Sequence, residues 1–327
     1  MCREQQHCCN VKAPHGYDGR TQVEAFATYS CQQCGAGLWF GGVRTELCPY
    51  CASPNFLERA PARDQPRPRF VIGFAHDADR AKQLLARWLG SRHWFADTAI
   101  KRGTLENLRG VYLPAYLYSA ATRTDYTASI GEHYTETEDV ETTDAQGNKK
   151  TERKTVTRTE YRPLAGSHVG YVTDVVVSAS IGLAQQELGR VEPFDMAQLR
   201  RFDPHVISGW ISEEYSRTAD ECSATSRTEV TDEVGARLRR FMPGDSHADL
   251  AWRTRVSWES MDPILLPIWV AAVRYRADRP PLRVVINGQT GKATGQVPIA
   301  WWKVVLAVAA VAALVAFGLY LRSHPPW

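Results

Sequence analysis

Val304-Val-Leu-Ala-Val-Ala-Ala-Val-Ala-Ala-Leu-Val-Ala-Phe-Gly-Leu-Tyr320 is an uncharged run between Lys303 and Arg322. A helix rises about 1.5 Å per residue, so with Trp301 and Trp302 this run is long enough to cross a hydrocarbon core of about 30 Å. The two tryptophans and Tyr320 are placed like an aromatic belt at the two interfaces, where Lys303 and Arg322 can snorkel. We therefore predict one transmembrane helix over residues 301–322, rather than the buried core helix of a soluble domain.

Only residues 323–327 follow this helix, which predicts a short tail and anchoring through the C-terminus. The N-terminal sequence Met1-Cys-Arg-Glu-Gln-Gln6 is polar and does not resemble a signal peptide. The chain as a whole has the composition of a globular protein, with 23% charged and 44% hydrophobic residues. A net charge of +3 is too small to predict extensive coating of nucleic acid.

Four of the eight cysteines form two pairs, Cys31-x2-Cys34 and Cys48-x2-Cys51, separated by thirteen residues. This spacing is typical of two knuckles that converge on one tetrahedral Zn²⁺. Four thiolates leave no open coordination position, so the predicted zinc is structural rather than catalytic. Because thiolates must stay reduced, we expect the body in the cytosol and the short tail on the other side of the membrane.

A second metal is a separate question, raised by Cys2, His7, Cys8 and Cys9. These residues lack a partner pair, so a frayed tail is the favoured interpretation of residues 1–24 and a second zinc is the alternative.

The sequence predicts an α+β protein with a small N-terminal zinc ribbon, an antiparallel α+β body and the C-terminal transmembrane helix. The predicted segments are the tail 1–24, the zinc ribbon 25–60, a solvated Pro/Arg linker 61–69 and the body 70–298 with an exposed hairpin over 132–162. In the hairpin an acidic strand and a basic strand flank a turn at Gln146-Gly147-Asn148. A unit as small as the ribbon depends on its metal, so loss of Cys31 or Cys48 is expected to unfold residues 25–60 and leave the body intact.

Within the body we predict a helix from Asp77 to Leu89, helical regions opening at Pro193 and over 212–241 with a break in the middle, and several strands. The strands are expected at 70–75, from 113 onward, and at 172–178, 250–259, 264–275 and 282–288. On the 250–259 strand, Trp252, Thr254, Val256 and Trp258 are expected to face the same way. The segments 111–120 and 264–273 resemble one another, which predicts an internal duplication of a helix-plus-hairpin unit.

Sequence motifs give no positive case for an enzyme. Gly291-Lys292 follows a strand, but Ala293 stands where a phosphate loop needs Ser or Thr, so this segment is predicted to be a turn. Cys222 has no histidine beside it and is interpreted as a buried thiol.

The order of several motifs resembles a bacterial family of zinc-ribbon single-pass membrane proteins, labelled transcription-factor-IIB-type or primosomal protein N-prime (replication factor Y) helicase-like. These motifs are the zinc ribbon, Leu113-Pro-Ala-Tyr116, Pro193-Phe-Asp195, Ile264-Leu-Leu-Pro-Ile-Trp269, the segment 285–292 and the terminal anchor. The resemblance covers most of residues 25–303. The family's metal-binding cysteines carry over to Cys31, Cys34, Cys48 and Cys51, whereas residues 1–24 depart from the further N-terminal cysteine module that members have.

The resemblance implies a non-enzymatic membrane adaptor that docks a cytosolic partner, such as a membrane-stress or flotillin-like scaffold protein, at the bilayer. The helicase label does not fit, because the chain has no ATP-binding loop. The alternative is a membrane-tethered nucleic-acid binder in which Trp39, Phe40 and Arg44 meet bases and phosphates, with charge added by Arg63, Arg67 and Arg69.

Overall fold

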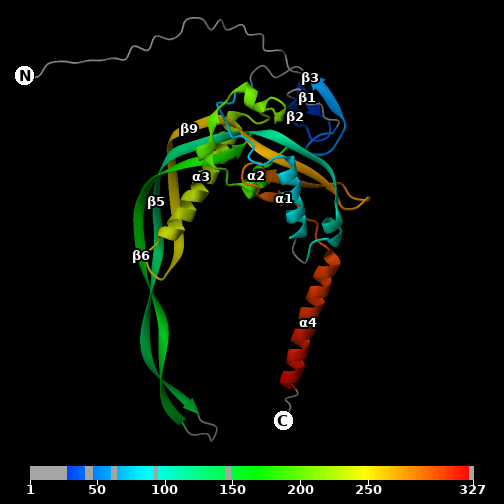
Figure 1. The fold of residues 1–327 in the computed structure, drawn as a ribbon. Helices are drawn as coiled ribbons and strands as arrows, with labels where there is room; N and C mark the ends of the chain where they lie inside the picture. Colours follow the sequence, from blue (N-terminus) through cyan, green and yellow to red (C-terminus); the bar gives the residue numbers. More distant parts are fainter. Residues whose placement is uncertain (1–27, 41–46, 60–64, 92–94, 144–148, 324–327) are drawn as a thin grey trace, which may run out of the picture.

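The computed structural model describes residues 28–40, 47–59, 65–91, 95–143 and 149–323 as a mixed α+β protein (Figure 1). Its helices are α1 (Ala78–Gly90), α2 (Gln185–Val191), α3 (Ala219–Phe241) and α4 (Trp301–Ser323), with 3-10 turns at Thr98–Arg102, Met196–Gln198 and Pro204–Ile207. Its strands are β1 (Thr28–Cys31), β2 (Gly37–Phe40), β3 (Phe56–Arg59), β4 (Phe70–Val71), β5 (Thr104–Thr143), β6 (Lys149–Ser178), β7 (Arg200–Arg201), β8 (Ile211–Glu213), β9 (Ser246–Arg274), β10 (Leu282–Asn287) and β11 (Ala293–Gly295). The predicted α+β class is confirmed.

Two long strands, β5 and β9, pair antiparallel in the middle of the sheet, whose order is β11-β10-β9-β5-β8-β2-β1-β3. β6 pairs along the outer part of β5, and β4 and β8 add two short parallel pairings. In β9, Ile264, Leu266 and Ile268 contact one apolar cluster, whereas Ala271 and Val273 contact another that includes α1. Both faces of the sheet are therefore covered here, which explains why residues 264–273 form an unbroken apolar run.

β-bulges explain why the long strands look like separate short ones in the sequence. β9 has extra residues opposite β5 between Ser257 and Ser260 and between Ala248 and Ala251. Trp258 and Asp249 lie in these bulges with φ of 52° and 53°. Each bulge reverses the alternation of side chains, so the prediction that Trp258 faces the same way as Trp252 is wrong, and Trp258 is 89% exposed. The two strands predicted over 250–275 are one strand.

The predicted hairpin 132–162 is the outer end of a longer one. β5 and β6 pair from Ala115 opposite Ser178 to Thr143 opposite Lys149, so the strand predicted at 172–178 is the inner end of β6. The expected opposite charges do meet, since Arg158 pairs with Glu136 at 3.0 Å and also with Glu138. The predicted turn residues 146–148 lie outside the described residues.

The first helix follows the sequence prediction. The Asp77 side chain caps α1 by accepting a hydrogen bond from the Arg80 backbone N–H at 2.8 Å. Leu85, Trp88 and Leu89 are buried along one face, as expected from their spacing. Of the strand predicted before this helix at 70–75, only Phe70–Val71 forms a strand, β4.

The later helices differ from the prediction. Ser212 and Glu213 belong to β8 (Ile211–Glu213) rather than to a helix. α3 begins at Ala219 behind a capping box of Thr218 and Glu221 and continues without a break. The prediction that a helical region begins at Pro193 is wrong. The helix near this residue, α2, ends at Val191, and Met196–Gln198 forms only a short 3-10 turn. The buried Asn287 side chain explains this ending, because it donates to the Val191 and Pro193 carbonyls at 3.0 and 3.1 Å.

The two similar segments lie side by side as neighbouring strands. Leu113 is opposite Leu266, its equivalent in the similar segment, and Tyr112 and Pro114 are opposite Pro267 and Leu265. A local two-fold relation between the segments would give this register. α1 precedes one segment and α3 the other. The internal duplication itself stays a prediction.

α4 extends away from the body, on the same side as the outer end of the β5–β6 hairpin, whereas β1, β2 and β3 lie at the opposite end of the molecule (Figure 1). Its first turn is tied to the body, because the Lys303 Nζ donates to the Ala96 carbonyl at 2.9 Å and the Ala300 N–H donates to the Phe95 carbonyl. Lys303 is 6% exposed, so the expectation that it snorkels freely is wrong. The rest of the helix is exposed and is no core helix of this chain.

Candidate metal centre

The four predicted cysteines converge at the ends of the short strands β1, β2 and β3. The Cys31 and Cys51 Sγ atoms are 3.5 Å apart, those of Cys34 and Cys48 are 3.7 Å apart, and all four lie within 4.8 Å of one another. Four sulfurs in a tetrahedron around a metal at about 2.3 Å are about 3.8 Å apart. The cluster could therefore hold one metal ion.

Each cysteine pair is held in a backbone turn, and the two turns are of the same kind. The Gly35 N–H donates to the Cys31 carbonyl, and the Ala52 N–H donates to the Cys48 carbonyl, each at 2.9 Å. The residue after the second cysteine has a left-handed conformation in both turns, with φ of 78° at Gly35 and 58° at Ala52. Glycine adopts this conformation readily, whereas the second turn adopts it with an alanine, which is less favourable.

The thiol groups influence each other's ionisation. A hydrogen bond from Cys48 lowers the pKa of Cys34 to about 5, and the same bond raises the pKa of Cys48. Burial raises the pKa of Cys51 to about 11. Thiols this close cannot all ionise unless a cation compensates their charge, which is the condition that a bound metal supplies.

A buried carboxylate joins this cluster to the body, and sequence reasoning missed it. Glu213 ends β8, which pairs antiparallel with β2 and whose first residues pair in parallel with β5. Its side chain accepts hydrogen bonds from the Tyr50 hydroxyl at 2.5 Å and from the Ser180 hydroxyl at 2.6 Å. Tyr50 lies between Cys48 and Cys51, so the second knuckle is bonded to the body through Glu213. A pairing 163 residues apart leaves no local signal in the sequence.

Burial is the largest influence on the pKa of Glu213. Its hydrogen-bond partners are the two hydroxyls and the Gly182 N–H, and desolvation raises its pKa to about 7. The folded protein therefore binds this proton more tightly than the unfolded chain, whose glutamate titrates near 4.5. The stabilisation from the protonated group is complete below about pH 4.5, falls as the pH rises toward 7 and is lost above it.

Glu213→Gln is expected to remove this pH dependence. The shift from 4.5 to about 7 corresponds to about 3 kcal/mol, so the variant should be more stable than the parent chain above pH 7 by up to that amount. Urea unfolding at a series of pH values between 5.5 and 8.5 measures the difference, and any loss of metal at acidic pH affects both chains alike. Glu214→Gln is the matched control, and a stability difference for Glu213→Gln that does not change with pH would contradict the assignment.

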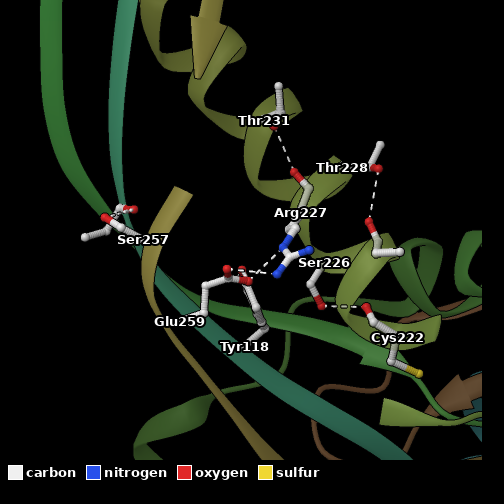
Figure 2. Close-up of polar contacts among 10 residues, drawn as sticks. Tyr118, Cys222, Ser226, Arg227, Thr228, Thr231, Ser257 and Glu259 are labelled. Carbon is white, nitrogen blue, oxygen red and sulfur yellow. Dashed lines mark hydrogen bonds and ion pairs between the residues drawn. The ribbon is translucent and has the colours of Figure 1, made fainter. Parts of the chain in front are cut away.

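A second polar cluster lies where α3 packs on the sheet (Figure 2). Figure 2 shows Arg227 of α3 and Tyr118 of β5 meeting at Glu259 of β9. Glu259 follows the bulge residue Trp258 in the sequence. The guanidinium donates from Nε at 2.8 Å and from Nη2 at 3.0 Å, and it lowers the pKa of Glu259. All three groups are satisfied within this network, so it ties the helix to the bulged strand.

Cys222 lies one turn of α3 before Ser226, whose hydroxyl donates to the Cys222 carbonyl at 2.8 Å (Figure 2). The thiol is buried, and burial raises its pKa to about 11. The interpretation of Cys222 as a buried thiol is confirmed.

Several residues named in the sequence analysis have no described structure. Cys2, His7, Cys8 and Cys9 lie outside the described residues, as do Arg44 and Arg63. Of the linker arginines that are described, Arg67 is exposed and Arg69 forms an ion pair with Asp262 of the body. The predicted linker is thus attached to the body at its end, and Gln65 adds two hydrogen bonds to the Tyr215 backbone at 3.1 Å.

Comparison with known proteins gives one distant similarity. No family model matches the chain, and no solved structure matches it. Over 240 residues the chain is 21% identical to the uncharacterized protein YdjG of Bacillus subtilis (strain 168). The match covers 72% of this chain and 65% of YdjG, so the chain spans less than two thirds of that protein's length. The membership of a zinc-ribbon family stays a prediction.

Proposed function

We propose that this chain is a zinc-stabilised, single-pass membrane adaptor whose body docks a cytosolic protein at the bilayer. The observation that carries the proposal is α4. Its segment Trp301–Tyr320 has a mean hydropathy of 2.3, and only 6% of the apolar window is buried in the structure. Val308, Val311, Leu314 and Phe317 are among its exposed side chains. Transfer of such a side chain out of water is worth roughly 1.5–3 kcal/mol, so the whole helix strongly favours an apolar surrounding such as lipid.

The metal we propose is zinc. Four sulfur ligands in a tetrahedral arrangement suit Zn²⁺, and a site closed by four thiolates supports folding rather than catalysis. The thiolates require a reducing compartment, which supports a cytosolic body and a C-terminal end on the opposite side of the membrane.

Insertion of α4 requires a change in its angle to the body. The outer end of the β5–β6 hairpin lies on the same side of the body as α4 (Figure 1), and its exposed ion pairs, such as Arg153 with Asp139, exclude it from hydrocarbon. We infer that the angle changes beyond Lys303 when α4 spans a bilayer, because the hydrogen bonds of Ala300 to Phe95 and of Lys303 to Ala96 hold the foot of the helix on the body.

This inference predicts that the hairpin stays in water in the membrane-bound protein. Thr157→Cys, an exposed position on β6, should react with a membrane-impermeant maleimide from the body's side of sealed vesicles and not from the other side. Leu314→Cys, in the middle of α4, is the control that should be protected from both sides. Protection of Thr157→Cys by the bilayer would contradict the proposed orientation.

The surface we propose for docking is the outer part of β6. Among the described residues β6 pairs with no strand other than β5. Arg237 of α3 donates to the Tyr171 carbonyl at 2.9 Å, so the part of β6 that we propose for pairing with a further strand lies on the hairpin side of Tyr171. Val169 and Tyr171 are exposed near this edge, Tyr171 by 75%. Exposed tyrosine is enriched at protein-binding surfaces, so Tyr171 is the residue that favours this edge as a docking site.

The nucleic-acid alternative has less support. Phe40 packs against Tyr29 and Phe56 with ring centres 5.1 and 5.9 Å apart. Trp39 packs against an apolar cluster that contains Tyr112 and Ile207. Stacking on bases needs exposed rings, and these two rings are used in the packing of the protein.

A photo-crosslinking residue in place of Tyr171 tests the docking function in cells. We expect a cytosolic protein to be captured from this position in the membrane fraction and not from Leu57, an exposed position on β3. Recovery of DNA or RNA with no protein would favour the tethered nucleic-acid binder. Recovery of the same protein from both positions would contradict the proposed surface.

A further inference from the structure

A cavity of about 480 Å³ lies at the foot of α4, where the helix meets the body. Its lining includes Asp97, Tyr275, Arg276, Arg279, Trp301 and Trp302. This volume falls in the range of small-molecule sites, and the mixture of aromatic rings with a few charged groups is typical of them. The metal cluster is formed by other residues, so this cavity is a separate feature.

The first arginine of the cavity is held in a fixed position. Arg276 donates to the Asp97 Oδ2 from Nε at 3.0 Å and approaches the same oxygen with Nη2 at 2.9 Å. Asp97 is itself held, because its Oδ1 accepts from the Ala99 N–H at the start of the 3-10 turn Thr98–Arg102. A positioned guanidinium has further N–H donors with which to bind an anion.

The second arginine has no close carboxylate among its ion pairs in the described residues. Arg279 is 66% exposed and reaches the Asp278 carboxylate at 4.0 Å. Asp97 and Asp278 offset the formal charge of the two arginines, but the contact of Arg279 with Asp278 is long and both side chains are exposed. The Arg279 guanidinium can therefore turn toward an anion in the cavity.

The position of the cavity along α4 indicates what kind of anion it meets. The exposed rings of Trp301 and Trp302 form its wall, and the uncharged part of α4 begins immediately afterwards at Val304. Tryptophans at such a boundary lie at the level of lipid headgroups. A ligand in the cavity would thus sit at headgroup depth, next to a helix that continues into the acyl chains.

We propose that this cavity binds the phosphate of an anionic phospholipid headgroup, with Arg276 and Arg279 as its ligands and Trp301 and Trp302 beside the glycerol backbone. The inference rests on the proposed anchoring of α4 in a bilayer. It adds a lipid preference to that anchor and a means of fixing the angle between the body and the membrane surface.

The test uses the full chain in nanodiscs of equal phosphatidylglycerol and phosphatidylcholine, with the lipids retained on release identified by native mass spectrometry. We expect the parent chain to retain phosphatidylglycerol preferentially. The double variant Arg276→Gln, Arg279→Gln should lose this preference, by about fivefold for each arginine. Arg322→Gln, which removes an exposed arginine at the other end of α4, is the matched control and should keep it.

Three results would overturn the inference. They are equal retention of the two lipids by the parent chain, an unchanged preference in the double variant, and displacement of the lipid by inorganic phosphate, which would indicate a site for a soluble phosphate. Resistance of each chain to carbonate extraction is measured on the same samples. If the double variant loses its lipid preference but resists carbonate extraction, the change is in the lipid site and not in membrane anchoring. Release of the parent chain by carbonate would instead refute the proposed membrane anchor.

Discussion

Cys48→Ser is expected to lower the free energy of unfolding of the whole body by at least about 4 kcal/mol, and removal of the metal by a chelator should have the same effect. The sequence alone predicts a smaller consequence, namely unfolding of residues 25–60 next to an intact body. The structure changes this expectation because the ribbon is built into the body's core.

Cys48 and Leu38 belong to the same apolar cluster as Val111, Leu113 and Leu266 of the central strands. β2 also continues the sheet through β8, and Tyr50 is bonded to the buried Glu213. Loss of the metal would release these contacts together, exposing apolar surface and leaving a buried carboxylate without its partner.

Hydrogen exchange with and without chelator measures how far this effect reaches. We expect faster exchange in β8 and in residues 180–191 of the body as well as in the ribbon, and elemental analysis should find one zinc per chain. Cys222→Ala is the matched control, since it removes a buried thiol that is not in the metal cluster. Faster exchange confined to residues 28–59 would show that the ribbon is an independent unit.

The second large effect is expected in α4. Val311→Arg together with Leu314→Arg should move the protein from the membrane to the soluble fraction, because each arginine at the centre of a membrane helix costs about 3 kcal/mol and replaces a favourable apolar residue. The two substitutions therefore disfavour insertion by about 6 kcal/mol.

Extraction of membranes with carbonate, followed by detergent, measures this change. The swapped variant Val311→Leu, Leu314→Val keeps the composition of the helix and should remain integral. Both substituted positions are exposed, so neither pair of changes disturbs packing within the body. An arginine variant that still resists carbonate extraction would show that α4 does not span the bilayer.

Local signals in the sequence predicted local features. The spacing of four cysteines predicts the cysteine cluster that could hold a metal, the Asp77 cap and its apolar face predict α1, and hydropathy predicts α4. In each case neighbouring residues carry the information, because knuckles, caps and membrane helices are defined over short distances along the chain.

Non-local features were missed or misplaced. The bulge at Trp258 reverses the alternation of inward and outward side chains on which strand prediction depends. The sequence therefore predicts two strands where the structure has one. The sequence predicts helix from residue 212, but Ser212 and Glu213 lie in a strand because β8 pairs with β2 and β5. Glu213 gave no signal, since its partners Tyr50 and Ser180 are distant in sequence.

The most direct test of the adaptor follows the docked partner rather than the chain itself. A chain that ends at Lys303 keeps the hydrogen bond to Ala96 and the whole body but loses the rest of α4. In cells that carry only this chain, we predict that the protein captured from position 171 leaves the membrane fraction together with the body. A captured partner that stays on the membrane without α4 would contradict the claim that this chain holds it there.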